Sequence, residues 1–175
     1  MDQLGFRLHN KEDIMNNLVL IAAIGENNEL GMNNKLIWYL PGDLKFFKEQ
    51  TMNKNIVMGI NTFKSLPKLL PGRKHIVLTH QDIDLGEEVK IFHDRNELLD
   101  YIQNINDEVF VIGGAQIYHQ FIDEANKLVL TEVSASEPNA DVYFPNFNKK
   151  EWNVTEVATN EDKGVKYKHL IYERK

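Results

Sequence analysis

The sequence contains no cysteine, and this absence excludes several classes of function at once. None of its 175 residues can form a disulfide, a thiolate zinc site or a cysteine nucleophile. The six histidines also lack the HxxxH or HExxH spacing of common metal sites, and no GxSxG marks a serine nucleophile. No apolar run approaches the roughly 20 residues that a membrane-spanning helix needs. Metalloenzyme, hydrolase and membrane functions are therefore poorly supported.

Positive charge is also scarce. Lys and Arg number 20 against 26 Asp and Glu, which gives a net charge of −6. A general nucleic-acid surface needs a basic stripe, so we expect no nucleic-acid partner, and an anionic ligand must find its positive partners locally. The first 17 residues are interrupted by charge and carry no signal-peptide apolar segment. We therefore expect a cytoplasmic protein that binds neither membrane nor nucleic acid.

The chain is long enough for one domain, and it shows no internal repeat or linker. Because the first strong apolar pattern begins at Leu18, we expect residues 1–17 to be a poorly ordered extension and 18–175 to form the domain. A monomer is the simplest expectation for such a chain.

The order of apolar runs predicts an α/β fold, mainly parallel with an antiparallel edge. Helices are expected at 41–51, 61–66, 94–104 and 115–122, the third with Asp94 as N-cap and Glu97 completing a capping box. The polar segments 26–34 and 134–147 are predicted as loops. Strands are expected at 18–25, 55–59, 74–79, 89–92, 108–112, 127–133, 152–158 and 165–173.

The stretch 37–47, IWYLPGDLKFF, places the carboxylate of Asp43 on the first turn of an apolar-faced helix. A charge in such company is costly to bury without a partner. Asp43 is therefore either a helix cap, which local preference favours, or a carboxylate that binds a ligand with matching hydrogen-bond donors. Trp38 is by default a core residue, and Thr131 by default a strand former.

Glycines end two of the predicted strands where a helix follows, in IVMGINTF (56–63) and VFVIGGAQIY (109–118). A glycine there lets the backbone approach a ligand, and the helix that follows directs free N–H groups at an anion. Two such junctions at one edge of a sheet suggest a bound diphosphate, although neither is a GxGxxG or P-loop motif. The alternative is that each glycine only eases a turn.

A small basic cluster, Lys68, Arg73 and Lys74, lies next to Leu69 and Leu70. The cluster is either a solvated loop or a carboxylate clamp, in which Arg73 can bind in bidentate fashion.

Together these motifs resemble the dihydrofolate reductase family over about residues 18–174. The matching stretches, in the family's order and spacing, are LIAAIGENNELGMNNKLIWYLPGDLKFFKEQT, IVMGINTFKSL, LPGRKHIVLTH, VFVIGGAQIYHQF, LVLTEV and ADVYFP. The resemblance implies a single domain with a central, mostly parallel eight-stranded sheet, an antiparallel C-terminal edge strand and about four flanking helices. It also implies reduction of 7,8-dihydrofolate to tetrahydrofolate by hydride transfer from NADPH, and binding of antifolate inhibitors.

The resemblance assigns roles around the substrate. Asp43 would accept hydrogen bonds from the pterin and support protonation at N5, Thr131 would hydrogen-bond that carboxylate, and Trp38 would hold an ordered water. Leu36 would cover the nicotinamide, and Arg73, with Lys68 nearby, would bind the glutamate carboxylate. The pterin and benzoyl groups would be lined by Ile21, Ala23, Leu44, Phe47, Leu66, Leu70 and Ile112.

The resemblance also assigns the cofactor site. Tyr118 would lie beside the nicotinamide and the substrate, and a cis peptide is expected at Gly113-Gly114. The cofactor-binding residues would be Ala22, Leu30, Gly31, Asn34, Gly59, Asn61, Thr62, Leu78, Thr79, His80, Gly113, Gly114, Ala115, Gln116, Ile117 and Tyr118.

Three positions depart from the family pattern. Ile60 stands where many members carry an arginine for the 2′-phosphate of NADPH, and Gln116 stands where others carry a second arginine. Because of Ile60, the preference for NADPH over NADH is expected to be weaker than usual. Thr79 and His80 occupy other positions that bind the 2′-phosphate in some members, with Lys54 or Lys74 as possible helpers. Ile37 replaces a common proline before Trp38.

Two other functions compete with this one. A pyrimidine reductase of riboflavin synthesis has a related fold and uses NADPH, but it has no need of the pterin-binding IWYLPGDL stretch. A catalytically idle nucleotide-binding protein would not be expected to keep Asp43, Trp38, Thr131 and Arg73 together.

Overall fold

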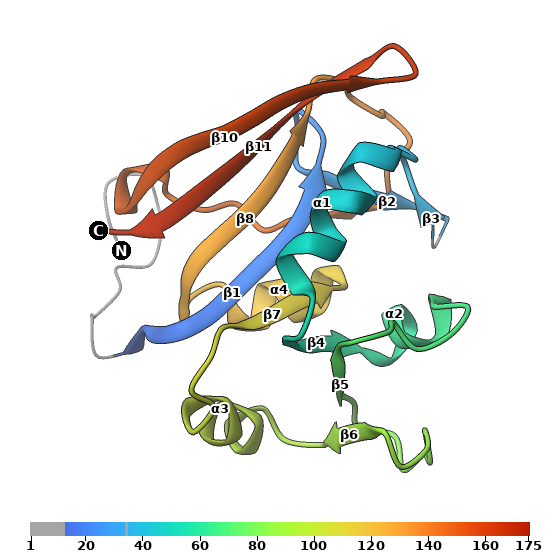
Figure 1. Ribbon diagram of the computed structural model, residues 1–175, viewed down its shortest axis with the longest axis vertical. Coiled ribbons are helices and arrows are strands. Elements are labelled where there is room, and N and C mark those ends of the chain that lie inside the picture. The colour runs from blue at the N-terminus through green and yellow to red at the C-terminus, as the bar shows by residue number, and fades with distance from the viewer. Residues whose placement is uncertain (1–12, 34) are drawn as a thin grey trace.

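An eight-stranded sheet dominates the computed structural model, which describes residues 13–33 and 35–175 (Figure 1). Its strands are β1 (Met15–Ile24), β4 (Asn55–Gly59), β5 (Lys74–Leu78), β6 (Val89–Phe92), β7 (Val109–Gly113), β8 (Ala125–Val133), β10 (Trp152–Asp162) and β11 (Val165–Arg174). Their order across the sheet is β10-β11-β8-β1-β7-β4-β5-β6.

Strand β1 lies in the interior of the sheet and pairs in parallel with both β7 and β8. Its continuous apolar run, LVLIAAI, fits a strand that is covered on both faces. The pairs β4–β7, β4–β5 and β5–β6 are parallel too, whereas β11 runs antiparallel to β8 and β10. The mostly parallel sheet is therefore confirmed, but the antiparallel strand lies one position in from the edge, because β10 folds outside it.

Side chains alternate along β1 and so divide the core into two apolar clusters. Val19 and Ile21 face a cluster that includes residues of α1 (Pro41–Thr51) and α2 (Ile60–Ser65). Leu18 and Leu20 face the other cluster, which includes residues of α3 (Arg95–Gln103) and α4 (Ala115–Phe121). In Figure 1, α1 lies in front of β1, and α4 lies farther from the viewer. The predicted helices are confirmed, and the Asp94 side chain accepts from the Glu97 N–H as an N-cap.

The ordered sheet begins earlier than predicted, at Met15 rather than at Leu18. Met15 pairs with Ala125 of β8, and its N–H donates to the Glu124 carbonyl. Asn17 donates from Nδ2 to the carbonyls of Ile102 and Ile105, both at 2.9 Å. These polar contacts hold the start of β1 where the apolar pattern gave no signal. Residues 1–12 of the predicted extension lie outside the described residues.

The two predicted loops contribute two strands, β2 (Glu29–Met32) and β9 (Val142–Tyr143), to a second sheet of three short strands, and β3 (Lys35–Leu36) follows directly after the first loop. The order of the three strands is β3-β2-β9. Glu29 is buried, and its carboxylate accepts the N–H groups of Asn27 and Glu137 at 2.7 and 2.6 Å. Burial opposes its charge, but these hydrogen bonds leave the pKa of Glu29 below its ordinary value. The prediction of two simple loops was wrong, since strands of two to four residues carry no readable period.

Arg174 joins the end of β11 to the segment that leads into β8. Its Nε donates to the Ala125 carbonyl and its Nη2 to the Ile122 carbonyl, both at 2.9 Å. Its Nη1 pairs with Glu151 Oε2 at 2.8 Å, and the guanidinium lies 4.0 Å from the centre of the Trp152 ring. Nη2 also donates to the Asp123 carbonyl at 3.3 Å, so one planar side chain binds three carbonyls and one carboxylate together.

We predict that Arg174→Lys lowers the free energy of unfolding by about 2 kcal/mol, because a lysine cannot replace the fork of donors and leaves buried acceptors unpaired. Urea denaturation measures the change. Glu173→Gln, at the exposed neighbouring position, is the control and should stay within about 0.5 kcal/mol of the parent. An Arg174→Lys protein as stable as the control would contradict the prediction.

Candidate active site

Asp43 lies in the first turn of α1 but does not cap it. The helix begins at Pro41, and Leu40 occupies the N-cap position without a side-chain hydrogen bond. The Asp43 carboxylate instead accepts a hydrogen bond from the Thr131 hydroxyl of β8, at 2.5 Å. Capping, which local preference favoured, is therefore the wrong interpretation of this carboxylate.

The surroundings of Asp43 oppose its charge. Its side chain is 18% exposed. Burial raises the pKa of Asp43 above its ordinary value, although the Thr131 hydrogen bond and the nearby His169 act in the opposite direction. A carboxyl group of this kind takes up a proton more readily than one at the surface, which suits acid–base chemistry near neutral pH.

Gly42 brings the start of α1 against the β10–β11 hairpin. Its N–H donates to Asp162 Oδ2 at 2.8 Å, and the Tyr167 hydroxyl donates to the same oxygen at 2.7 Å. A Cβ at position 42 would collide with the Tyr167 hydroxyl oxygen, so only glycine fits. Sequence reasoning missed Asp162 and Tyr167, because nothing local indicates that this hairpin packs on α1.

His169 is a third group at this site that the sequence did not reveal. It lies opposite Thr131 in the β8–β11 pairing, and its Nδ1 is 2.9 Å from Thr131 Oγ1 and 3.8 Å from Asp43 Oδ1. Its ring stacks on Phe46 with centroids 3.8 Å apart. The alternation of Tyr167, His169 and Ile171 places them on one face of β11, but only the strand register brings that face to Asp43.

Most of the apolar residues predicted to line the substrate gather on the α1 and α2 side of the sheet. One cluster contains Ile21, Phe47, Leu66, Leu70 and Ile112. Ala23 is not in it but pairs with Thr131 across β1 and β8, and Leu44 is 38% exposed. Their roles stay predictions, but five side chains from four segments of the chain meet in one place.

Arg73 is held by its own loop and by α1. Its Nε donates to the Pro71 carbonyl at 3.1 Å and its Nη1 to Thr51 Oγ1 at 3.3 Å. Partial burial lowers the pKa of Arg73, which remains charged at neutral pH. His75 Nε2 accepts the Leu70 N–H at 3.0 Å and so fixes the loop, whereas Lys68 is exposed.

The residues predicted to hold the cofactor gather around the other cluster and around the two glycine junctions. Ala22, Leu30, Leu78, Ile117 and Tyr118 share that cluster. The β4–β7 pairing sets Met58 opposite Gly113, and a Cβ at Gly114 would lie 3.4 Å from Thr62 Oγ1. The two junctions are therefore neighbours, and the predicted cis peptide at Gly113-Gly114 is confirmed. The helix that begins at Ala115 carries Gln116 on its exposed side, and Asn61 is exposed on α2.

Tyr118 connects the second junction to the central strand. It is 4% exposed, and its hydroxyl donates to the Ile21 carbonyl at 2.6 Å. Burial raises the pKa of Tyr118, so the hydroxyl stays neutral and remains a donor.

The segment predicted to cover the nicotinamide belongs to the small sheet. Leu36 pairs with Gly31 and is 64% exposed. Trp38 packs against Gly25 so closely that a Cβ there would lie 2.6 Å from its Cη2 atom. Asn34 lies outside the described residues.

The residues predicted to bind the 2′-phosphate lie at opposite ends of strand β5. Thr79 and His80 follow β5, and the buried Thr79 hydroxyl accepts the Gln81 N–H at 3.1 Å. Lys54 and Lys74 lie at the other end of these strands, where β4 and β5 begin. Lys74 pairs with Asn55 there, and Lys54 directly precedes Asn55. Lys54 also pairs with Asp107 at 2.7 Å. The expectation that either lysine helps Thr79 was wrong, since five residues of strand span about 15 Å.

His93, which sequence reasoning missed, does lie at the Thr79 edge. Its Nδ1 is 2.8 Å from the Thr79 carbonyl oxygen, and because that oxygen can only accept, Nδ1 donates. The pairing of β5 with β6 brings His93 there, and the sequence carries no signal of that pairing.

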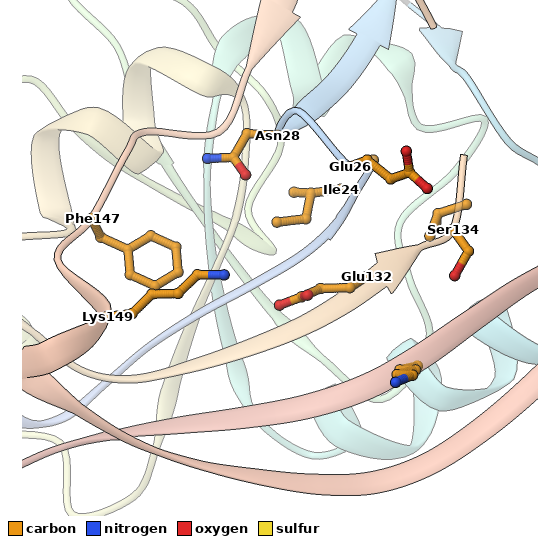
Figure 2. Close-up of a pocket in the computed structure, with 10 residues that line it drawn as sticks. Ile24, Glu26, Asn28, Glu132, Ser134, Phe147 and Lys149 are labelled. Atoms are coloured by element: carbon orange, nitrogen blue, oxygen red, sulfur yellow. The ribbon is translucent and has the colours of Figure 1, made fainter. Parts of the chain in front are cut away.

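Figure 2 shows a pocket that Glu132 of β8 lines. Glu132 follows Thr131, and successive residues of a strand point to opposite faces, so this pocket lies on the face of β8 away from Asp43. Glu132 lines this pocket together with Phe147 and Lys149, and the Tyr172 hydroxyl donates to its carboxylate at 2.5 Å. The volume of the pocket, about 220 Å³, is below the ~300–1,000 Å³ of most ligand pockets. It is not the site of the predicted chemistry.

Two negative findings concern the part of the chain from residue 13 onward, without residue 34. It contains no group of three or more His, Asp or Glu side chains arranged to hold a metal ion. None of its helices is long and apolar enough to cross a membrane.

Known proteins resemble the chain over nearly its whole length. Residues 17–174 match the family model described as dihydrofolate reductase. A dihydrofolate reductase of Buchnera aphidicola subsp. Acyrthosiphon pisum is 43% identical over 132 residues, 75% of this chain and 80% of the relative. That of Bacillus subtilis is 35% identical over 158 residues, 89% and 93% of the two chains.

A solved structure agrees with the sequence matches. It is a dihydrofolate reductase from Enterococcus faecalis complexed with NADP(H) and RAB-propyl, and it superposes with a TM-score of 0.81 at 28% identity. The superposition covers 92% of this chain and 98% of that one. The resemblance inferred from the sequence motifs is thereby confirmed, and the chain belongs to the dihydrofolate reductase family.

Proposed function

We propose that Asp43 orients the pterin ring and supports its protonation at N5 while the enzyme reduces 7,8-dihydrofolate to 5,6,7,8-tetrahydrofolate. One observation carries this proposal: a largely buried carboxylate, hydrogen-bonded to Thr131, lies among the segments that carry the predicted substrate residues. Its free lone pairs can accept hydrogen bonds from a ring that presents adjacent N–H donors.

The apolar cluster around Ile21, Phe47 and Ile112 supplies the second requirement of the reaction. Hydride transfer needs two flat rings held at contact distance, so positioning in a site that excludes water does most of the work. In such surroundings the Asp43 charge acts strongly on a nearby imine nitrogen and favours its protonation. NADPH, when bound, supplies the hydride.

The second junction fits NADPH. Gly113 has a φ of +126°, which disfavours any larger residue, and the paired glycines Gly113 and Gly114 leave the backbone between β7 and α4 without side chains. Gly59 likewise has little room for a side chain, since a Cβ there would lie 3.0 Å from Ile117 Cγ1. We propose that the diphosphate lies against this backbone, with Tyr118 and Ala22 near the nicotinamide.

We propose further that Arg73 binds the glutamate carboxylate of the substrate. Its Nε and Nη1 contacts fix the guanidinium plane, which favours a planar anion. Antifolate inhibitors would use the same site. The remaining expectations, a cytoplasmic monomer that binds no nucleic acid, stay predictions, and the net charge of −6 supports the last of them.

The two competing functions have less support. The pyrimidine reductase alternative does not need Asp43 on α1, and the idle-protein alternative does not need a buried charge. Both would leave the contact between Asp43 and Thr131 without a purpose, because burial of a carboxylate is costly.

We predict that Asp43→Asn lowers dihydrofolate turnover at neutral pH by about 10²–10⁴-fold, because the amide cannot supply the charge or accept a proton. NADPH absorbance measures turnover, and cofactor fluorescence should show unchanged NADPH binding. Glu49→Gln, which removes an exposed carboxylate from the same helix, is the matched control. A loss of only a few-fold in Asp43→Asn would refute the role of this residue.

The same substitution should stabilise the fold. Because burial raises the pKa of Asp43, the stability linked to this group is complete below its ordinary pKa of 3.8 and is lost as pH rises through the folded-state pKa. At pH 7, Asp43→Asn should therefore raise the thermal midpoint by about 2–4 °C. Differential scanning calorimetry at pH 7 and at pH 4 measures the effect, which should shrink at the lower pH. A lower midpoint at pH 7 would count against a destabilising carboxylate.

We predict that NADPH remains the preferred cofactor and that His80→Ala lowers the ratio of kcat/KM for NADPH over NADH by about 3–10-fold. The reason is that His80 is exposed at the edge where β5 ends. Lys54→Ala, at the opposite edge, should leave the ratio unchanged. If the parent enzyme uses NADH equally well, the assignment of Thr79 and His80 fails.

A further inference from the structure

Asp43, Thr131 and His169 form a continuous hydrogen-bonded chain. Thr131 Oγ1 lies 2.5 Å from Asp43 Oδ1 and 2.9 Å from His169 Nδ1. The three residues come from α1, β8 and β11, so tertiary structure alone brings them together. His169 is 2% exposed, and among the described residues its Nε2 has no hydrogen-bond partner.

The number of protons available to Asp43, Thr131 and His169 fixes which group donates in each of their hydrogen bonds. The Thr131 hydroxyl has one hydrogen, and an ionised Asp43 can only accept, so that hydrogen points to Asp43. Thr131 Oγ1 must then accept from His169, which requires the imidazole tautomer with its proton on Nδ1. In this arrangement Nε2 carries a bare lone pair, and the buried end of the ring presents no unpaired N–H.

The reverse direction is unfavourable for the same reason. If a protonated Asp43 donated to Thr131, the Thr131 hydroxyl would have to donate to His169 Nδ1. The imidazole proton would then lie on Nε2, as a buried N–H without a partner, which protein interiors rarely contain. A proton taken up by Asp43 is therefore directed away from Thr131, to Oδ2.

We propose that His169 is a positioning residue for the reduction: through Thr131 it stabilises the ionised Asp43 and keeps any proton of that carboxyl on Oδ2. The inference rests on the proposed role of Asp43. His169 does not touch the substrate in this scheme and acts only through the Thr131 hydroxyl.

The other groups that face Asp43, Thr131 and His169 stay in one charge state near neutral pH. Asp162, from β10, accepts from Tyr167 and Gly42, and the Tyr167 hydrogen bond lowers the pKa of Asp162. Burial raises the pKa of Tyr167 of β11, which remains neutral. Burial also lowers the pKa of His169, despite the charge of Asp43. Of the groups facing it from α1, β8, β10 and β11, only Asp43 is left to titrate.

A matched pair of substitutions separates this role from simple packing. His169→Phe keeps an aromatic ring to stack on Phe46 but removes the Nδ1 donor. His169→Asn removes the ring but keeps an amide N–H that can reach Thr131 from nearly the same place. If His169 only fills space, the phenylalanine variant should behave like the parent and the asparagine variant should not.

The tautomer can be measured without any turnover. In the ¹⁵N spectrum of histidine-labelled parent enzyme, with the His169 signals assigned by their loss in His169→Phe, we expect a protonated Nδ1 and a bare Nε2 from pH 6 to pH 9. A proton on Nε2, or an imidazolium at pH 7, overturns the proposal. Because this readout needs no substrate, it stands even if Asp43→Asn refutes the proposed function.

The pH profile of kcat/KM for dihydrofolate tests the catalytic consequence. His169→Phe should move the apparent pKa upward by about 0.5–1, since the ionised Asp43 loses part of its stabilisation. His169→Asn should stay within about 0.3 of the parent, and His119→Gln, on the exposed side of α4, should not move it. An unshifted profile in a folded His169→Phe enzyme, or equal shifts in both His169 variants, overturns the proposal.

Discussion

The hydrogen bond between Thr131 and Asp43 is the constraint on which the site depends. It joins the first turn of α1 to β8 at a point where a carboxylate would otherwise be buried without a partner. Two further contacts hold the same turn, since Gly42 donates to Asp162 and closely approaches Tyr167. The position of the carboxylate is thus set by three elements, and α1 cannot shift without breaking one of these contacts.

The central position of β1 suits a strand that would contact both proposed ligands. Its alternating side chains put Ile21 in the cluster assigned to the substrate and Ala22 in the cluster assigned to the cofactor. The Ile21 carbonyl also accepts from Tyr118, which ties the second glycine junction to the strand between the two sites. A hydride donor and its acceptor can therefore meet at the end of β1 without a second domain.

Most of the fold could be predicted because its signals are local. The apolar runs of β1, β4 and β8 and the helix pattern of α1 are each readable within about ten residues. The family motifs likewise identified Asp43 and Thr131. What could not be predicted depends on register between distant segments: His169 beside Thr131, and the small sheet that Glu29 braces. The wrong assignment of Lys54 has the same origin, since only strand direction shows which edge of the sheet it occupies.

Two unfavourable features of the molecule lie together at one carboxylate. Asp43 is charged in surroundings that raise its pKa, and His169 carries a buried nitrogen without a partner among the described residues. A sequence selected for stability alone would remove both, since a hydrophobic pair of similar volume avoids these desolvation costs. Within residues 13–33 and 35–175, Trp152 Nε1 and Glu124 Oε2 are also buried without a partner, so an unpaired atom alone does not mark the site. At Asp43, however, the unpaired imidazole nitrogen belongs to a group that is hydrogen-bonded, through Thr131, to a carboxylate whose charge is opposed by burial. The combination of a buried carboxylate and a hydrogen-bonded imidazole, more than any cavity, supports the proposal that the chemistry takes place there.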